Sequence, residues 1–304
     1  MWSAGSSASS CTSRSGDAIT TAPDRTIRRD FRDAAAVGRR ARLELEFEVR
    51  GGRTIIAHAY AEPPYRVRAF DMAGTAYVIV VCSGPGVFPG DSLEQVVHVG
   101  RGARAVLTSQ AALQVHPGNG PPATIGHEYR VAPEGELHCH WDPMIPFTAA
   151  SVSQRLCIDA DAGARLYWSD AMMAGRLGRG EAWRFAEVAH DLQLRIGGEL
   201  KYLERFRLDP RRHPLAAPWV AGGAGYFSTT LVKHPDARAD TAGAFHRDLQ
   251  EMSSGLAAVD ALEDGLIAAR VAASNGAVFA AVRRSLRHAI AESLFHQPDL
   301  LARK

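Results

Sequence analysis

Five short segments of this chain share one pattern, in which a run of alternating apolar residues meets a glycine-centred turn and then resumes. Glycine adopts positive φ at little cost, which is what a tight reversal between two strands requires. We therefore predict a large β-structure built from hairpins. The spacing between the turns is uneven, so the pattern is not a strict repeat. The five segments are residues 47–56, 99–107, 131–137, 158–166 and 194–200.

The charge and the hydropathy exclude two classes of partner. The 304 residues carry a net charge of +2, with 22% charged side chains and no basic patch of the kind that binds nucleic acid. The longest strongly apolar run, residues 76–82, is far shorter than the roughly 20 residues of a membrane-spanning helix. It is typical of a strand buried on both faces. We therefore expect a protein that contacts neither nucleic acid nor a membrane.

The cysteines and the N-terminus indicate the compartment. The four cysteines form no Cys-x-x-Cys pair and no dense disulfide framework, and Cys82 lies within the apolar run. Residues 1–17 are rich in Ser and Gly and lack the apolar core of a secretory signal. We expect a cytoplasmic protein with reduced thiols, and a disordered N-terminal tail over residues 1–40.

A β-rich domain is expected over residues 41–304. Residues 42–49 alternate charged and apolar side chains without a break, as in a half-buried antiparallel strand. Strand-like runs continue to about residue 209. Residues 211–225 are rich in Pro, Gly and Ala and are expected to form a crossing loop, after which residues 226–232 form one more strand.

The last quarter of the chain, from about residue 240 to residue 304, is expected to form a small helix–strand–helix element. Residues 242–256 carry apolar side chains at helical spacing, and residues 266–272 are typical of a strand. Ser274 or Asn275 is then expected to cap a second helix. The apolar stripe of that helix consists of residues spaced by four: Val278, Val282, Leu286 and Ile290.

The other face of this second helix is basic. Arg283, Arg284 and Arg287 are expected on its exposed face, where they are a candidate contact for a protein partner. The alternative is an ordinary solvated helix face.

A loop rich in Gly and Pro follows the buried strand. Residues 84–91 contain three glycines and two prolines, which impose a turning backbone, and they end in Asp91. The loop lacks the lysine and the following helix of a phosphate-binding loop. Asp91 either caps backbone N–H groups of a structural turn or presents a carboxylate to a polar channel.

A string of small and polar residues occupies positions 108–112, between apolar flanks. These side chains either point into a narrow polar interior or lie on the solvent face of a β-ladder. Periodicity alone does not separate the two arrangements.

His138 and His140 lie two residues apart in an expected strand, so their side chains share one face, together with Asp142. Such a set is a possible metal-ligand arrangement, although no fourth ligand can be identified. Cys139 points to the opposite face. The alternative is a strand with polar residues outside and Cys139 in the core.

Residues 142–147 contain Pro143 and Pro146, which are incompatible with a central strand. The chain is therefore expected to leave the sheet here. A rigid, irregular segment beside Asp142 is a candidate contact or channel-lining site.

Familiar catalytic motifs are missing from the sequence. It contains no serine nucleophile elbow, HExxH, Walker lysine or dinucleotide fingerprint. This agrees with a β-structure that presents surfaces rather than an active site.

Five motifs, taken in their order along the chain, resemble those of the urease accessory protein UreD (also called UreH) family. The resemblance covers roughly residues 42–295, including the strand at residues 265–271. The motifs are residues 43–53, 84–91, 107–112, 142–147 and 203–209.

The resemblance implies a mainly β fold, a β-helix-like stack of hairpins with a small C-terminal α/β element. It also implies a non-catalytic scaffold, with no catalytic residue and no tightly bound cofactor. Its partners would be apo-urease and a UreF-like helical accessory protein that recruits a UreG-like GTPase. The complex would insert nickel into urease in a GTP-dependent step, with the ion in transit through a water-filled tunnel.

Ni²⁺ accepts carboxylate, imidazole and thiolate ligands, and a transit path must bind it weakly enough to release it. Asp91 and Asp142 are therefore candidate transient ligands, and Asp91→Ala is expected to lower the nickel content of urease. Two alternatives stay open. One is a β-structured module for another protein partner, and the other is a metal-dependent hydrolase that uses His138, His140 and Asp142.

Overall fold

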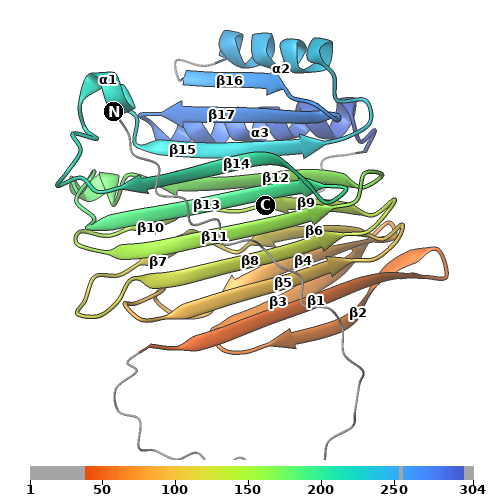
Figure 1. The fold of residues 1–304 in the computed structure, drawn as a ribbon, viewed down its shortest axis with the longest axis horizontal. Helices are drawn as coiled ribbons and strands as arrows, with labels where there is room; N and C mark the ends of the chain where they lie inside the picture. Colours follow the sequence, from red (N-terminus) through yellow and green to blue (C-terminus); the bar gives the residue numbers. More distant parts are fainter. Residues whose placement is uncertain (1–37, 253–255, 298–304) are drawn as a thin grey trace, which may run out of the picture. The chain divides into compact units, whose positions relative to one another are not determined.

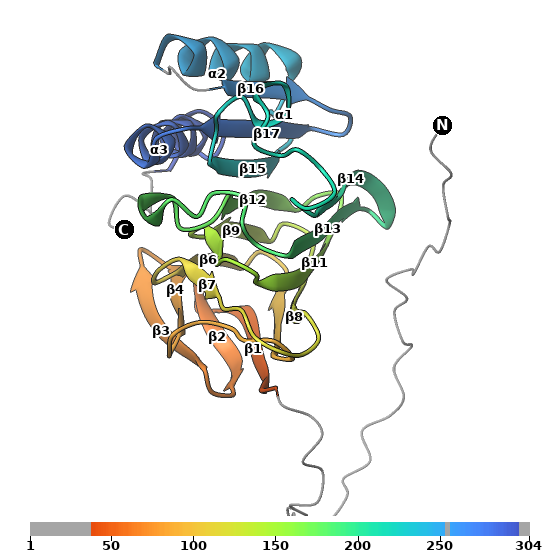
Figure 2. The same cartoon turned by 90° about the vertical axis from the view of Figure 1, so that its left-hand side faces the viewer.

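The computed structural model describes residues 38–252 and 256–297. This part of the chain is mainly β, as the sequence predicts. It forms a seven-stranded sheet, here called sheet A, and a ten-stranded sheet, sheet B. The two sheets pack against each other, and the helices cover the outer side of one end of sheet B (Figure 1; Figure 2). The prediction of a tail over residues 1–40 falls almost wholly outside the described residues, and the first strand begins at Arg40.

The strands of sheet A occur in the spatial order β14-β13-β11-β8-β5-β1-β2. Their bounds are β1 Arg40–Arg50, β2 Arg53–Ala61, β5 Ser92–Val99, β8 Ala123–Val131, β11 Ser151–Ala160, β13 Glu187–Ile196 and β14 Glu199–Leu208.

The strands of sheet B follow the order β16-β17-β15-β12-β9-β6-β4-β3, with β7 and β10 attached beside β12. Their bounds are β3 Tyr65–Met72, β4 Thr75–Cys82, β6 Arg104–Ser109, β7 Leu113–Val115, β9 Glu136–His140, β10 Met144–Pro146, β12 Arg165–Met173, β15 Tyr226–Lys233, β16 Leu256–Ala261 and β17 Leu266–Ala273.

The middle of both sheets is parallel, because the chain passes back and forth between them. Strands β1, β5, β8, β11 and β13 of sheet A pair in parallel, and so do β4, β6, β9 and β12 of sheet B. Successive strands thus alternate between the two sheets, which confirms the β-helix-like stack. Antiparallel strands extend each sheet at its ends.

Only two of the five glycine-centred turns, at residues 51–52 and 197–198, connect the two strands of a hairpin. The other three, at residues 100–102, 132–135 and 161–163, join a strand of sheet A to a strand of sheet B. The prediction of five hairpins is therefore wrong for these three. A glycine turn reverses the chain, but long-range packing decides whether the next strand pairs with the previous one or crosses to the opposite sheet.

The inner strands of sheet B are buried on both faces. In β12, Trp168 belongs to the core between the sheets, whereas its neighbour Tyr167 packs in the core under the helices. In β4, likewise, Val78 belongs to the core between the sheets and Tyr77 to the core under the helices. This confirms a strand buried on both faces at residues 76–82. Alternating side chains of one strand thus stabilise two apolar layers.

The C-terminal element is close to the prediction. Helix α2 spans Ala239–Met252, the strands β16 and β17 follow, and helix α3 spans Gly276–Ser293. The element therefore has one strand more than predicted, and residue 256, expected at the end of the first helix, begins β16 instead. Asn275 is the N-cap of α3, and its side chain accepts hydrogen bonds from the N–H groups of Ala277 and Val278. Three members of the predicted apolar stripe of α3 are buried, namely Val282, Leu286 and Ile290.

One connecting segment behaves as expected, because residues 211–225 form a loop that includes the short helix α1, Pro218–Ala221. The proline-containing segment does so only in part. The chain leaves β9 at His140, but it returns to sheet B as the three-residue strand β10, which pairs with both β7 and β12, so the expectation that it leaves the sheet is wrong. Pro146 is tolerated there because it pairs with β7 alone. Within residues 38–252 and 256–297, no helix combines the length and apolar character that crossing a bilayer would require.

Candidate functional site: two adjoining internal cavities

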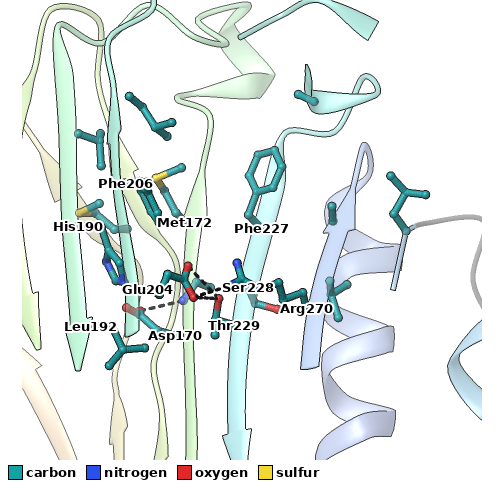
Figure 3. A pocket seen from close by; sticks show the side chains of 18 of the residues that line it. Asp170, Met172, His190, Leu192, Glu204, Phe206, Phe227, Ser228, Thr229 and Arg270 are labelled. Atoms are coloured by element: carbon teal, nitrogen blue, oxygen red, sulfur yellow. Dashed lines mark hydrogen bonds and ion pairs between the residues drawn. The ribbon is translucent and has the colours of Figure 1, made fainter. Parts of the chain in front are cut away.

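Two cavities lie between the sheets. One of about 620 Å³ lies against the edge strand β14 and beside β15 and β17, and we call it the edge cavity (Figure 3). The other, of about 200 Å³, is lined in part by residues 84–86 and 109–114, and we call it the loop-side cavity. Met144, Gln154 and Asp170 line both cavities. The two spaces therefore adjoin, and the edge cavity opens to solvent where the exposed Val220 and Leu256 line it.

The loop-side cavity is framed by two of the segments that the sequence singled out. The N–H of Val87 donates to the carbonyl of Gln114 (2.9 Å), so the loop after β4 is joined to β7. Gly86 has φ of 126°, and a Cβ at this position would lie 2.2 Å from the Gln114 carbonyl oxygen. Only glycine permits this approach of the two backbones. Ser109 and Gln110 both border the cavity, but Ser109 is half-buried whereas Gln110 is exposed, so the interior arrangement of the polar string at residues 108–112 holds for Ser109 and not for Gln110.

Asp142 lies on the loop-side cavity. The Ser109 hydroxyl donates to its Oδ2 atom (2.9 Å), and the N–H of Asp142 donates to the Ser109 Oγ (2.8 Å). The pair fixes the carboxylate at the point where the chain leaves β9. Asp142 thus lines a cavity, and its role as a contact or channel-lining carboxylate stays a prediction.

Asp170 marks the junction of the two cavities. Its Oδ1 accepts from the N–H of Ala171 (2.8 Å), and its Oδ2 accepts from the Gln154 amide (3.3 Å). The Nδ1 of His190 lies 3.1 Å from the Gln154 Oε1, which extends the chain of contacts into the edge cavity. Burial raises the pKa of Asp170, an effect that His190 and the Ala171 N–H partly oppose.

Glu204 provides the carboxylate of the edge cavity. It is 8% exposed and its Oε2 accepts from Tyr202 (2.8 Å), Thr229 (3.0 Å) and the Arg270 guanidinium (2.9 Å). Figure 3 shows Asp170, Glu204, Thr229 and Arg270 gathered at one place, from strands of both sheets. Asp170 and Glu204 therefore lie together at the edge cavity, whereas Asp142 lines only the loop-side cavity.

His127 adds an unusual nitrogen to the loop-side cavity. It is 9% exposed, and its Nδ1 has no hydrogen-bond partner among the described residues. Burial, together with nearby His190, lowers the pKa of His127 to about 3, so the ring is neutral at physiological pH. A neutral imidazole offers a lone pair to a transition metal.

The polar donors of this interior are separate carboxylate and imidazole groups. Within residues 38–252 and 256–297, no group of three or more His, Cys, Asp or Glu side chains is arranged to hold a metal ion. Isolated carboxylate and imidazole groups of this kind are ligands that a divalent transition-metal ion accepts one at a time.

The sequence prediction missed four polar residues of this interior: His127, Asp170, His190 and Glu204. A signal exists for Asp170, since it ends a run of buried residues in β12. Glu204 has a weaker signal, because it lies at an inward position of the alternating strand β14.

Asp91 lines neither cavity. It is 3% exposed and forms an ion pair with Arg39 (2.7 Å), while the Arg39 and Phe88 N–H groups also donate to its carboxylate. Of the two arrangements that the sequence left open, the carboxylate that caps a structural turn describes this geometry. The channel-facing position does not, because the backbone of the loop holds the side chain.

The three side chains of the hydrolase alternative do not converge. His138 and His140 share one face of β9 as predicted, where they lie beside Glu136 (3.0 Å) and Tyr167 (3.4 Å). Cys139 is buried in the core between the sheets. Asp142 bonds to Ser109 on the core side, because the chain leaves the strand after His140 and the alternation of faces ends there.

The expectation of an exposed basic face on α3 is wrong for Arg283 and Arg287, which are 6% and 7% exposed. The Arg283 guanidinium donates to the carbonyl of Trp141 (3.0 Å) and to the Ser169 hydroxyl (2.9 Å). This face of α3 therefore packs on sheet B, and Arg284 alone of the three arginines is exposed.

Comparison with known proteins gives one consistent family. The model of the UreD urease accessory protein family matches residues 39–304. A urease accessory protein UreD of Deinococcus radiodurans is 30% identical over 276 residues, covering 88% of this chain and 97% of that protein. One of an Anaeromyxobacter species is 30% identical over 244 residues, covering 78% and 81%. One of a Methylobacterium species is 32% identical over 191 residues, covering 62% and 68%.

Proposed function

This chain belongs to the UreD family of urease accessory proteins, and we propose that it is a non-catalytic scaffold for nickel insertion into urease. In this proposal it acts in the cytoplasm and binds apo-urease and a UreF-like helical protein. The helical protein recruits a UreG-like GTPase, and the ion passes through the interior of the present chain toward urease.

The observation that carries the proposal is the set of carboxylates along two adjoining cavities. Asp142 lies on the loop-side cavity, Asp170 on both cavities and Glu204 on the edge cavity. The rest of the lining is largely apolar, so these three carboxylates are the anionic groups that a divalent cation would contact in the two cavities. Carboxylate and imidazole are both ligands that Ni²⁺ accepts.

The ligand environment supports transit rather than storage. Each carboxylate already accepts hydrogen bonds from a neighbour, such as Ser109 for Asp142 and Gln154 for Asp170. These partners fix the orientation of the carboxylate and compete with the ion for its oxygens. Both effects keep the ion weakly held and exchangeable.

The test is urease maturation in cells that express urease and its accessory proteins with the Asp142→Asn, Asp170→Asn double variant of this chain. We expect less nickel per purified urease, measured by mass spectrometry, while affinity purification recovers the same partner complex. Glu128→Gln is the control, because Glu128 pairs with Arg130 on the exposed face of sheet A. Full nickel loading with the double variant would overturn the transit proposal.

A further inference from the structure

The Glu204 carboxylate forms an ion pair with Arg270, whose side chain is largely exposed to solvent. Arg270 lies on β17 of sheet B, and Glu204 lies on β14 of sheet A. The guanidinium contacts Glu204 Oε2 at 2.9 Å and the Tyr202 hydroxyl at 2.8 Å. Both Glu204 and Arg270 line the edge cavity.

The two partners differ sharply in burial. The Glu204 side chain is 8% exposed, whereas the Arg270 side chain is 57% exposed. The arginine therefore retains contact with solvent and has a long flexible stem by which it can leave. Glu204 has no such freedom, since Tyr202 and Thr229 also hold its carboxylate.

We infer that Arg270 is a tethered cation that occupies the position at which a passing divalent cation would contact Glu204. Glu204 then binds nickel only after the Arg270 guanidinium has moved away. This inference rests on the proposed function, and it adds a residue that controls when the path accepts an ion.

Charge and geometry both indicate that Arg270 and a divalent cation compete for the Glu204 carboxylate. The Oε2 atom already accepts from three donors, whereas Oε1 accepts only from the Thr229 hydroxyl at 3.3 Å, so Arg270 and a metal compete for Oε2. A divalent cation beside the guanidinium would also meet its repulsion in a partly desolvated site. When Arg270 leaves, Tyr202 and Thr229 still orient the carboxylate. The apparent affinity for the ion is then reduced by the fraction of molecules in which Arg270 is displaced.

A purely structural role predicts something different. The Arg270–Glu204 pair joins sheet A to sheet B, so as a simple tie it would affect the free energy of unfolding and leave metal affinity unchanged. Metal binding to the isolated protein therefore separates the two roles.

The experiment uses the purified full chain and titrates it with Ni²⁺ by isothermal titration calorimetry. Arg270→Gln is expected to tighten binding by about tenfold or more, and adding Glu204→Gln is expected to abolish that gain. The control is Arg207→Gln. Arg207 forms a comparable pair with Glu187 on the outer face of sheet A (2.8 Å), and neither residue lines the two cavities.

An unchanged affinity in folded Arg270→Gln protein would overturn the inference, and so would an equal gain in Arg207→Gln. A gain that persists after Glu204→Gln would also overturn it, because the ion would then bind elsewhere. The result is independent of urease. Tighter binding by Arg270→Gln supports the inference even if nickel loading of urease fails to depend on this chain, a failure that would count against the proposed function alone.

Discussion

Asp91 accepts hydrogen bonds from both the main-chain N–H (2.7 Å) and the guanidinium (2.7 Å) of Arg39, which lies 52 residues earlier. The N–H of Phe88 donates to the same carboxylate at 3.0 Å. The residue before β1 is thereby joined to the glycine-rich loop before β5. Burial would raise the pKa of Asp91, but the bonds from Arg39 and Phe88 outweigh it and the pKa is lowered.

Asp91→Asn is expected to lower the free energy of unfolding at neutral pH by about 1–3 kcal/mol, because buried donors lose their charged acceptor. Since the folded-state pKa lies below the unfolded value of about 3.9, this stabilisation is complete above the unfolded value and is lost as pH falls through the folded one. The two proteins should therefore converge in acid. Urea denaturation across pH measures this. The exposed-pair variant Glu128→Gln should show no comparable loss, and a pH-independent gap would contradict the assignment.

Local features of the fold were predictable from local patterns. The alternation at residues 42–49 identified β1, and Asn275 identified the start of α3. The three glycine turns that join the sheets were not predictable as such. Each closes with a hydrogen bond between residues three apart, such as Gly135 N–H to Ala132 carbonyl (2.9 Å). The choice between a neighbouring strand and the opposite sheet depends on contacts that are distant in the sequence.

Arg283 shows a second limit of local patterns. Helical periodicity places Arg283 beside the apolar stripe of α3, and charge favours exposure. The structure buries Arg283 because the carbonyl of Trp141 and the hydroxyl of Ser169 supply acceptors on sheet B. Burial lowers the pKa of this guanidinium from its usual value. No pattern within α3 reveals acceptors that lie more than 100 residues away.

Arg283→Met is expected to destabilise the protein by about 1–3 kcal/mol, since it leaves buried acceptors without their donor. Arg284→Met is the matched control one residue along the same helix, and it should leave the unfolding midpoint unchanged because Arg284 is exposed. Thermal denaturation of the two variants measures the difference. Equal unfolding midpoints would contradict the docking role of Arg283.

The interior carboxylates were the least predictable part of the site. Asp142 was identified because the prolines that follow it mark a break in the strand. Asp170 and Glu204 instead lie inside regular strands, and their place in the proposed ion path depends on the cavities that they line. Cavities arise from the packing of side chains far apart in the sequence, so strand periodicity does not report them.

Asp170→Asn is expected to have opposite effects on stability and on function. The folded-state pKa of Asp170 is raised by burial, so the contribution of this carboxyl to stability is present below the unfolded pKa and lost as pH rises through the folded one. The neutral amide avoids that loss. The variant should therefore have a higher free energy of unfolding than the natural protein at neutral pH, and this difference should narrow in acid.

The nickel content of urease should nevertheless fall by roughly half or more in the Asp170→Asn variant, since a cation loses a charged contact. Denaturation curves and metal analysis test both parts. A variant that is less stable and fully functional would assign Asp170 a structural role.

Gly86→Ala is expected to disrupt the contact between the loop after β4 and β7. The added Cβ would lie 2.2 Å from the Gln114 carbonyl oxygen, which also accepts the Val87 N–H. Gly84→Ala is the matched control, because Gly84 also has positive φ (124°) but its added Cβ would meet only the Arg39 side chain at 3.9 Å. Backbone strain should cost either variant about 1–3 kcal/mol, and the clash at Gly86 should add about 1–3 kcal/mol more. Urea denaturation of the two variants isolates the added cost, because only Gly86→Ala must also separate the two backbones. Equal losses would mean that the two segments tolerate separation, and the loop-side cavity would then lack the rigid frame described here.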